Sequence, residues 1–400
     1  MKKIIPADRA GKVTYAIRDV VVEANKLKAQ GKRVLHLNIG DPNVYDFVTP
    51  RHMIEAVEKA MEKNLNGYAD SSGVDEAREA VAKEAVRDGI KGVTKSDVLI
   101  TTGVSEGIEL ALNALLNPGE NVLTPTPGYP VYTAVVHKIG ATLNQYKTDE
   151  ANGWQPDIDD IRKKINPKTK GIILINPNNP TGSLYSKKTL QEIVNIAREH
   201  NLLILSDEIY NKILFDGEKH VSTASLAGDI PILTFNGLSK NYIVPGWRVG
   251  WMIFSGPSEL RADFQETVFR LARARLCSPG PFQYAIKPAL EGPQDHIPEM
   301  NRKLQKRRDL IHKRFNEIEG FSCAKPKGAF YAFPKIELDI KDDKKFIMDI
   351  LYKKQILAVF GTGFGWEKPD HFRIVFLPPL DVLDESLNKL EEYVKENYGK

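Results

Sequence analysis

Short apolar runs alternate with amphipathic segments along the first two thirds of the chain. The runs have the length of buried strands and lie at Val98 to Thr101, Val122 to Thr124, Ile172 to Ile175, Leu202 to Ser206 and Ile232 to Phe235. Between the third and fourth runs, residues 186–200 begin at a serine that can cap a helix and then repeat apolar residues at helical spacing. Strands that alternate with helices in this way predict an α/β fold with a mostly parallel sheet.

The pattern changes after Pro279-Gly280-Pro281. A long charged helix is expected around Glu299 to Phe315, and short strands are expected at Ala329 to Phe333, Ile356 to Phe360 and Phe372 to Phe376. This pattern indicates a second, smaller α+β domain. We therefore place a large domain at residues 46–285 and a small domain at residues 1–45 together with 286–400.

Composition narrows the classes of protein that remain. The chain has 56 basic and 52 acidic residues and no long block of like charge, so we expect no nucleic-acid partner. Cys277 and Cys323 show no paired spacing, and the histidines are scattered, so we expect neither disulfides nor a metal site. No segment reads as a signal peptide or a membrane span, which predicts a soluble, cytoplasmic protein.

Lys240 follows the last apolar run of the predicted parallel sheet. The carboxyl ends of such strands collect ligands, so its side chain is expected in a cleft. A partly desolvated amine has a lowered pKa, and its neutral form can react with an aldehyde. A loop lysine on its own is usually solvated, so this prediction depends on the neighbouring motifs.

Two further strand ends carry polar residues. Asp207 ends the run Leu202 to Ser206, and Tyr210 follows three residues later. A buried acid at this place needs a cationic partner, such as a protonated pyridine nitrogen, although Asp207 taken alone favours a helix cap before Glu208 to Tyr210. The stiff turn Asn176 to Gly182 can hold the amide of Asn179 in one pose for a polar ligand, or can simply close a strand.

A phosphate site is indicated after the first strand. Thr101 to Gly107 joins that strand to a helix, so the Val104 amide and the Ser105 hydroxyl lie at a helix amino end. Arg248 offers the bidentate charge that a phosphate prefers. The segment matches neither the dinucleotide fingerprint nor the P-loop pattern, and Ser105 could serve only as a cap.

The order of these motifs is more specific than any one of them. Phosphate seat, asparagine turn, strand-end aspartate, lysine and arginine follow one another as in class I and II aminotransferases, the fold type I enzymes that use pyridoxal phosphate. The chain resembles this family over nearly its whole length, and within it the alanine transaminases of bacteria and archaea. The resemblance rests on Leu37 to Pro42, Asn176 to Gly182, Asp207 to Tyr210 and Asn236 to Lys240. It implies a large domain with a mostly parallel seven-stranded sheet between helices.

The resemblance also implies how pyridoxal 5′-phosphate is held. Lys240 would bind the cofactor aldehyde covalently and move protons, Asp207 would keep the pyridine nitrogen protonated, and Tyr129 would stack on the ring. The remaining contacts would come from Asn179 and Tyr210 to the ring oxygen, and from Val104, Ser105, Ser239 and Arg248 to the phosphate. Tyr68 would reach the phosphate of a neighbouring subunit, which implies a homodimer with shared active sites.

For the substrate, the resemblance assigns the α-carboxylate to Arg373, assisted by Asn179 and the Gly40 amide. Arg18 is a candidate for a second carboxylate, although a surface arginine on a helix explains it equally well. The chain departs from the family at Gly237, where many relatives carry a serine. Near the lysine, the phosphate contacts are therefore expected from Ser239 and Arg248.

The leading functional prediction is an alanine transaminase that converts L-alanine and 2-oxoglutarate to pyruvate and L-glutamate by two half-reactions at one site. Two substrates that differ by one small group differ in binding free energy by only ~1–3 kcal/mol. An aspartate or aromatic amino acid aminotransferase is therefore kept as an alternative. A carbon–sulfur lyase that uses the same cofactor is a second alternative. A cofactor-binding regulator is a third, but we expect no room for a DNA-binding module at either end.

Overall fold

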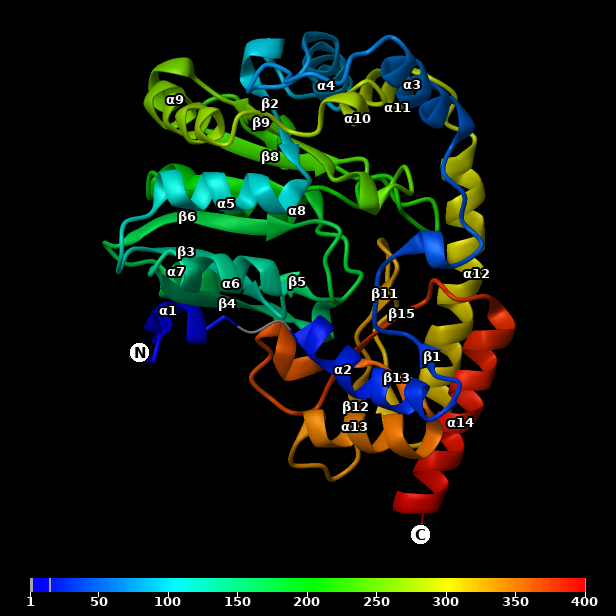
Figure 1. Cartoon of the computed structure of the whole chain (residues 1–400). Coiled ribbons are helices and arrows are strands. Elements are labelled where there is room, and N and C mark those ends of the chain that lie inside the picture. The colour runs from blue at the N-terminus through cyan, green and yellow to red at the C-terminus, as the bar shows by residue number, and fades with distance from the viewer. Residues whose placement is uncertain (1–2, 14–15, 400) are drawn as a thin grey trace.

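The structure is a computed structural model, and it describes residues 3–13 and 16–399. A larger part contains the main sheet, and a smaller part holds the short strands near the C-terminus (Figure 1). The long helix α12, His296–Glu317, runs along both parts (Figure 1).

One eight-stranded sheet forms the centre of the larger part, in the order β2-β9-β8-β7-β6-β3-β4-β5. Its strands are β2 (Val98–Thr102), β3 (Asn121–Thr126), β4 (Thr142–Asp149), β5 (Gln155–Pro156), β6 (Thr169–Ile175), β7 (Leu203–Asp207), β8 (Ile232–Gly237) and β9 (Val249–Ser255). The pairs from β4 through β3, β6 and β7 to β8 are parallel, whereas β9 is antiparallel to both β2 and β8. The α/β class and the mostly parallel sheet are confirmed.

The sheet has one strand more than the seven that the resemblance implied. The additional strand is β5, a two-residue edge strand that pairs antiparallel with the end of β4. The apolar pattern did not reveal β4 because its sequence, TLNQYKTD, is largely polar and its side chains are only partly buried. A strand near a sheet edge needs little apolar surface, so periodicity is a weak signal there.

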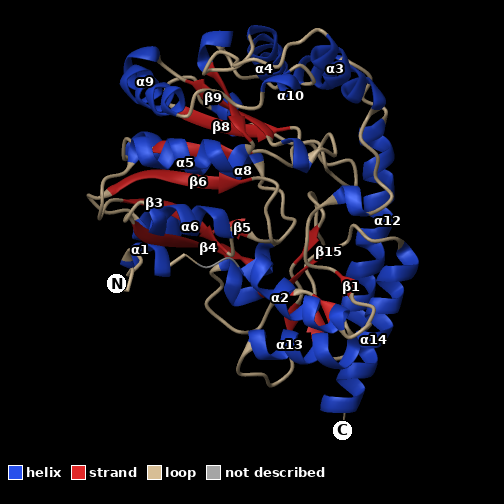
Figure 2. Ribbon diagram, viewed as in Figure 1, coloured by secondary structure: helices blue, strands red, loops and turns tan. Residues whose placement is uncertain are grey.

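Helices cover both faces of this sheet (Figure 2). Side chains of α5, α6 and α9 pack on one face, and side chains of α3, α4, α8 and α11 pack on the other. The crossover helix α8 begins after Ser186, whose side chain accepts a hydrogen bond from the Thr189 amide, as its sequence predicts. The helices of the larger part are α3 (Arg51–Glu62), α4 (Asp75–Arg87), α5 (Val104–Leu115), α6 (Pro130–Lys138), α7 (Ile158–Lys164), α8 (Lys187–Glu199), α9 (Ser258–Ala274), α10 (Gly280–Gln283) and α11 (Ile286–Glu291).

The smaller part has its own apolar core, and apolar side chains of residues 16–47 belong to it. Ile17, Val20 and Leu27 of α2 are buried there with side chains of the C-terminal third. Its strands are β1 (Leu35–His36), β10 (Phe321–Ser322), β11 (Tyr331–Ala332), β12 (Lys335–Ile336), β13 (Ile356–Leu357), β14 (Val359–Phe360) and β15 (Phe372–Val375), and its further helices are α2 (Ala16–Ala29), α13 (Asp343–Lys354) and α14 (Leu380–Tyr398). The short helix α1 (Asp8–Gly11) instead lies against α6 of the larger part (Figure 1). The domain boundaries themselves stay predictions.

Among residues 3–13 and 16–399, none of the helices combines the length and the apolar character that crossing a membrane requires.

Candidate active site

A cleft of about 540 Å³ opens at the carboxyl ends of β7 and β8, where the smaller part meets the sheet. All of the predicted site residues except Tyr68 line this cleft, which brings together segments from the whole chain. They are Gly40, Val104, Ser105, Tyr129, Asn179, Asp207, Tyr210, Ser239, Lys240, Arg248 and Arg373, and Arg18 lies in the same wall. The volume suits a small organic ligand.

Lys240 lies in the loop after β8, and its half-buried side chain reaches across the cleft. Its Nζ donates a hydrogen bond to the backbone oxygen of Gly40 at 2.8 Å. Loss of hydration lowers the pKa of Lys240 to about 8; the nearby Asp41 carboxylate opposes this shift and Arg248 adds to it. Near neutral pH, a useful fraction of this amine is therefore unprotonated and able to attack an aldehyde.

Asp207 is the last residue of β7 and is buried beside the cleft. Its Oδ2 accepts a hydrogen bond from the Tyr132 hydroxyl at 2.9 Å, and its Oδ1 accepts one from the Ile209 amide at 3.2 Å. Burial raises the pKa of Asp207 to about 6, although both hydrogen bonds favour the ionised form. A cation bound in the cleft would stabilise the ionised carboxylate and lower this pKa, and a protonated pyridine nitrogen fits this requirement.

Tyr210 extends the polar wall next to Asp207. Its hydroxyl lies 2.9 Å from the hydroxyl of Tyr331 on β11. Burial raises the pKa of Tyr210 well above its ordinary value, and the neighbouring Tyr331 adds to the effect. Tyr210 is therefore protonated at any working pH and can donate to a ring oxygen in the cleft.

Arg373 is contributed by the smaller part, on β15, and is almost completely buried. Its guanidinium lies between the rings of Tyr331 and Phe364, at 4.8 Å from each centroid. It also donates hydrogen bonds to the backbone oxygen of Asn38 and, at 3.2 Å, to Oδ1 of Asn179. A guanidinium held in one plane presents a rigid fork, which matches the geometry of a carboxylate.

The part of the cleft wall where α5 begins has the features of a phosphate seat. Helix α5 begins at Val104, so its first amides have no partner within the helix and carry the positive end of the helix dipole. Gly103 precedes this helix with φ at +71°, and a Cβ on it would lie 2.4 Å from Nη2 of Arg248. The absent side chain at Gly103 is therefore what lets the guanidinium lie against the start of the helix.

The departure at Gly237 has a steric explanation. Gly237 ends β8 opposite Gly250 of β9, and a Cβ there would lie 2.7 Å from the backbone oxygen of Val249. No side chain fits between the two strands at this register. Ser239, which directly precedes Lys240, is buried and lines the cleft, so it offers the hydroxyl that Gly237 lacks.

Replacing Gly103 with alanine is expected to weaken binding of pyridoxal phosphate about ten- to a hundredfold. The methyl group would displace the Arg248 guanidinium, and one hydrogen bond between charged groups is worth ~1.5–3 kcal/mol. Gly119→Ala is the matched control, because Gly119 also has a positive φ, of +83°, but has no atom within 4 Å of an added Cβ. Equal loss of affinity in the two variants, measured by fluorescence titration of the apoprotein, would mean that backbone strain alone is responsible.

Tyr68 lies outside this cleft. Its side chain is 85% exposed and lines a separate hollow with Asp70 and Tyr284. A single chain therefore does not bring Tyr68 to Lys240, and its contact with a neighbouring subunit stays a prediction.

Sequence reasoning missed three residues of the site. Tyr331 supports both Tyr210 and Arg373, Asp41 faces Lys240, and Tyr132 binds Asp207. Asp41 stands inside the motif Leu37 to Pro42, and Tyr132 lies one helical turn after Tyr129, so both had a signal in the sequence. Tyr331 had none beyond its place on a predicted strand.

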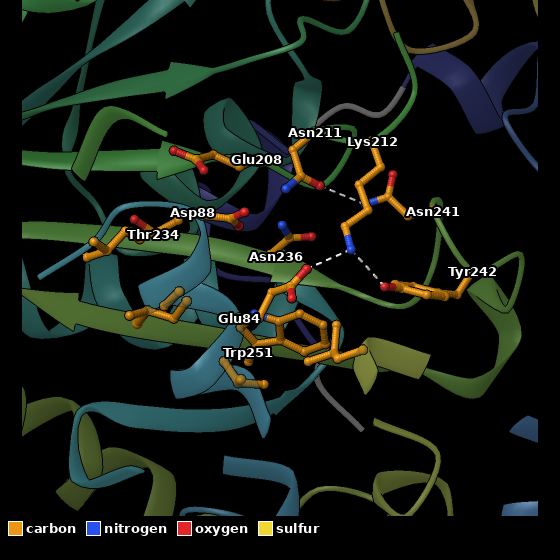
Figure 3. Close-up of a pocket in the computed structure, with 15 residues that line it drawn as sticks. Glu84, Asp88, Glu208, Asn211, Lys212, Thr234, Asn236, Asn241, Tyr242 and Trp251 are labelled. Carbon is orange, nitrogen blue, oxygen red and sulfur yellow. Dashed lines mark hydrogen bonds and ion pairs between the residues drawn. The ribbon is translucent and has the colours of Figure 1, made fainter. Parts of the chain in front are cut away.

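A second, smaller pocket is lined by residues that include Glu84, Glu208 and Lys212 (Figure 3). Lys212 crosses it and binds Glu84 at 2.6 Å and the Tyr242 hydroxyl at 3.0 Å. Glu208 lines the same pocket but is bound elsewhere. Its Oε1 accepts hydrogen bonds from the hydroxyls of Ser206 at 2.9 Å and Ser222 at 3.1 Å, and from the Thr223 amide at 3.1 Å.

Glu208→Gln is expected to stabilise the protein more at pH 8 than at pH 5. Burial raises the pKa of Glu208 to about 7, so the unfolded chain loses this proton first and stability falls as pH rises from about 4.5 to 7. The neutral amide removes this loss, worth up to ~3 kcal/mol, and keeps an oxygen acceptor. Melting temperatures at both pH values test this, with Glu319→Gln on the exposed surface as the control. An equal gain at both pH values would contradict it.

Comparison with known proteins agrees with this geometry. The profile of the family described as aminotransferase class I and II matches residues 32–390. The chain is 44% identical to glutamate-pyruvate aminotransferase AlaA of Escherichia coli K12, over 98% of both chains. It is also 44% identical to an alanine aminotransferase of Mycobacterium bovis, over 96% of this chain and 90% of that one. The solved structure of alanine aminotransferase from Pyrococcus furiosus superposes with a TM-score of 0.95 at 48% identity, over 98% of this chain and 100% of that one.

Proposed function

Because the chain belongs to the class I and II aminotransferases, we propose that its cleft holds pyridoxal 5′-phosphate on Lys240 and transfers amino groups between L-alanine and 2-oxoglutarate. The family uses this cofactor, which supplies a ring that withdraws electrons from the substrate α-carbon. The observation that carries the proposal is the convergence of Lys240, Asp207 and Arg373 on one cleft. The amine can react with an aldehyde, the acid can bind a protonated pyridine nitrogen, and the guanidinium can bind a carboxylate.

Each of these residues has a separate task. Lys240 would bind the cofactor covalently and, once a substrate amine has displaced it, carry the proton away from the substrate α-carbon through its Nζ. Asp207 would hold the proton on the ring nitrogen. Arg373, with Asn179 and the Gly40 amide, would fix the α-carboxylate, so that the bond to be broken stays near Nζ.

The phosphate would lie where α5 begins. It would be bound by the amides at the start of α5, the hydroxyls of Ser105 and Ser239 and the guanidinium of Arg248, all from residues that line the cleft. Tyr129, the residue before α6, would stack on the ring. Arg18, which lines the cleft wall, would be the candidate to contact the second carboxylate of 2-oxoglutarate.

Absorbance of the purified protein with pyridoxal phosphate tests the proposal directly. L-alanine should abolish the visible band of the bound cofactor and release pyruvate, and 2-oxoglutarate should restore the band and release L-glutamate. A band that responds to aspartate or aromatic amino acids but not to alanine would transfer the assignment to those substrates. Release of ammonia without amino transfer would favour the lyase alternative.

We propose further that two copies of the chain share their active sites through Tyr68. The exposed phenol and the hollow around it lie on the surface of the single chain, as a contact with a partner requires. Sedimentation of the holoenzyme as a monomer at working concentrations would contradict this part of the proposal and leave the rest untouched.

A further inference from the structure

Tyr132 is a buried tyrosine whose hydroxyl ends at the acid of the site. It lies on α6, is only 2% exposed, and donates to Oδ2 of Asp207 at 2.9 Å. The Tyr132 amide also donates to the backbone oxygen of Tyr129 at 3.2 Å. The start of α6 and the residue before it therefore carry both the Tyr129 ring that lines the cleft and the Tyr132 hydroxyl that contacts the Asp207 carboxylate.

The hydrogen bonds on Asp207 leave its carboxylate little freedom to rotate. Tyr132 binds one oxygen, and the Ile209 amide binds the other at 3.2 Å. Burial, reinforced by the neighbouring Asp207 carboxylate, raises the pKa of Tyr132 well above its ordinary value, so the phenol always keeps its proton and is the donor of the pair. A donated hydrogen bond stabilises the ionised carboxylate against the cost of burial.

We propose that Tyr132 is a positioning residue that fixes the orientation of the Asp207 carboxylate and keeps it ionised toward the cofactor ring. Tyr132 itself acts through Asp207 and touches neither substrate nor reacting atoms. This inference rests on the proposed function, because an ionised Asp207 matters only if a protonated ring nitrogen binds there.

Tyr146 offers a matched control for simple loss of a buried hydroxyl. It is also fully buried in the larger part, on β4, and its hydroxyl donates to a neighbouring group at the same distance of 2.9 Å. Its acceptor is the backbone oxygen of Ile173 rather than a carboxylate of the site. Phenylalanine at either position keeps the ring and removes one hydrogen bond.

The expected result for Tyr132→Phe is a dissociation constant for pyridoxal phosphate raised about tenfold or more, as loss of a hydrogen bond to a charged group implies. The pH midpoint of the visible absorbance of the bound cofactor should shift by about one unit, kcat should fall about tenfold, and KM for L-alanine should change less than about twofold. Tyr146→Phe should lower the melting temperature to a similar extent while the absorbance profile stays as in wild type. Equal effects of the two variants on the cofactor would overturn the proposal.

A double-mutant cycle with Asp207→Asn locates the effect. If Tyr132 acts through the Asp207 carboxylate, Tyr132→Phe should change cofactor affinity about tenfold in the wild-type background and less than about twofold in the Asp207→Asn background. The same loss in both backgrounds would show that Tyr132 acts independently of Asp207 and would refute this inference alone. A wild-type protein that does not bind pyridoxal phosphate at all would instead refute the proposed function.

Discussion

Lys240→Ala is expected to lower the rate of amino transfer by at least about 10⁴-fold, while pyridoxal phosphate still binds without a covalent bond. The upper range for one general acid or base is about 10⁴-fold, and the lysine would supply the covalent bond as well. The other side chains proposed to hold the cofactor, which include Arg248 and Asp207, also line the cleft and are untouched by the change.

Rapid mixing of each holoenzyme with L-alanine, followed by quantification of pyruvate, gives the single-turnover rate. Borohydride reduction provides the structural readout, because it should fix the cofactor to wild type and not to Lys240→Ala. A variant that keeps more than about a tenth of the wild-type rate would mean that another group moves the proton.

The same residue sets a dependence on pH. Loss of hydration lowers the pKa of Lys240 to about 8, so the reactive neutral amine accumulates as pH rises through that value. The rate at which the apoprotein binds pyridoxal phosphate covalently should therefore rise with pH and level off above about 8. A rate that still increases near the ordinary lysine pKa of about 10.4 would show that the amine is not desolvated.

Residues at the ends of predicted strands were the part of the site that sequence alone could locate. Asp207 and Lys240 follow long apolar runs, and β7 and β8 are neighbours in the parallel sheet, so their carboxyl ends had to meet at one edge. Val104 and Ser105 were found for a related reason, because a helix that follows a strand has its amino end at that same edge. The positions of these residues follow directly from where the strands end.

Residues that meet through packing of distant segments could not be located in this way. Tyr331 on β11 reaches Tyr210 after β7, and only the arrangement of the smaller part against the sheet brings the two hydroxyls within 2.9 Å. Gly103 and Arg248 show the same limit. The sequence predicts a phosphate site from both segments, but only their contact in the fold shows that Gly103 has to lack a side chain for the guanidinium to fit. The polar strand β4 was missed because its burial is partial.

Arg373→Lys is expected to raise KM for L-alanine about 10²- to 10³-fold, with a smaller effect on kcat. Lysine keeps the positive charge but loses the planar fork, its stacking between Tyr331 and Phe364, and its bond to Asn179. Truncating one partner of a buried charge pair costs ~2–5 kcal/mol, a factor of roughly 30 to 5,000 that contains this range.

Arg307→Lys is the matched control for loss of a buried arginine in the smaller part. Arg307 is also buried, stacks on Phe47 and binds Asp46, but it does not line the cleft. We expect this variant to lower the melting temperature and to leave KM for L-alanine within about twofold of wild type. Initial rates over a range of L-alanine concentrations measure both variants. A raised KM in both would mean that the arginines act through the stability of the smaller part, whereas a rise in Arg373→Lys alone would assign the α-carboxylate to Arg373.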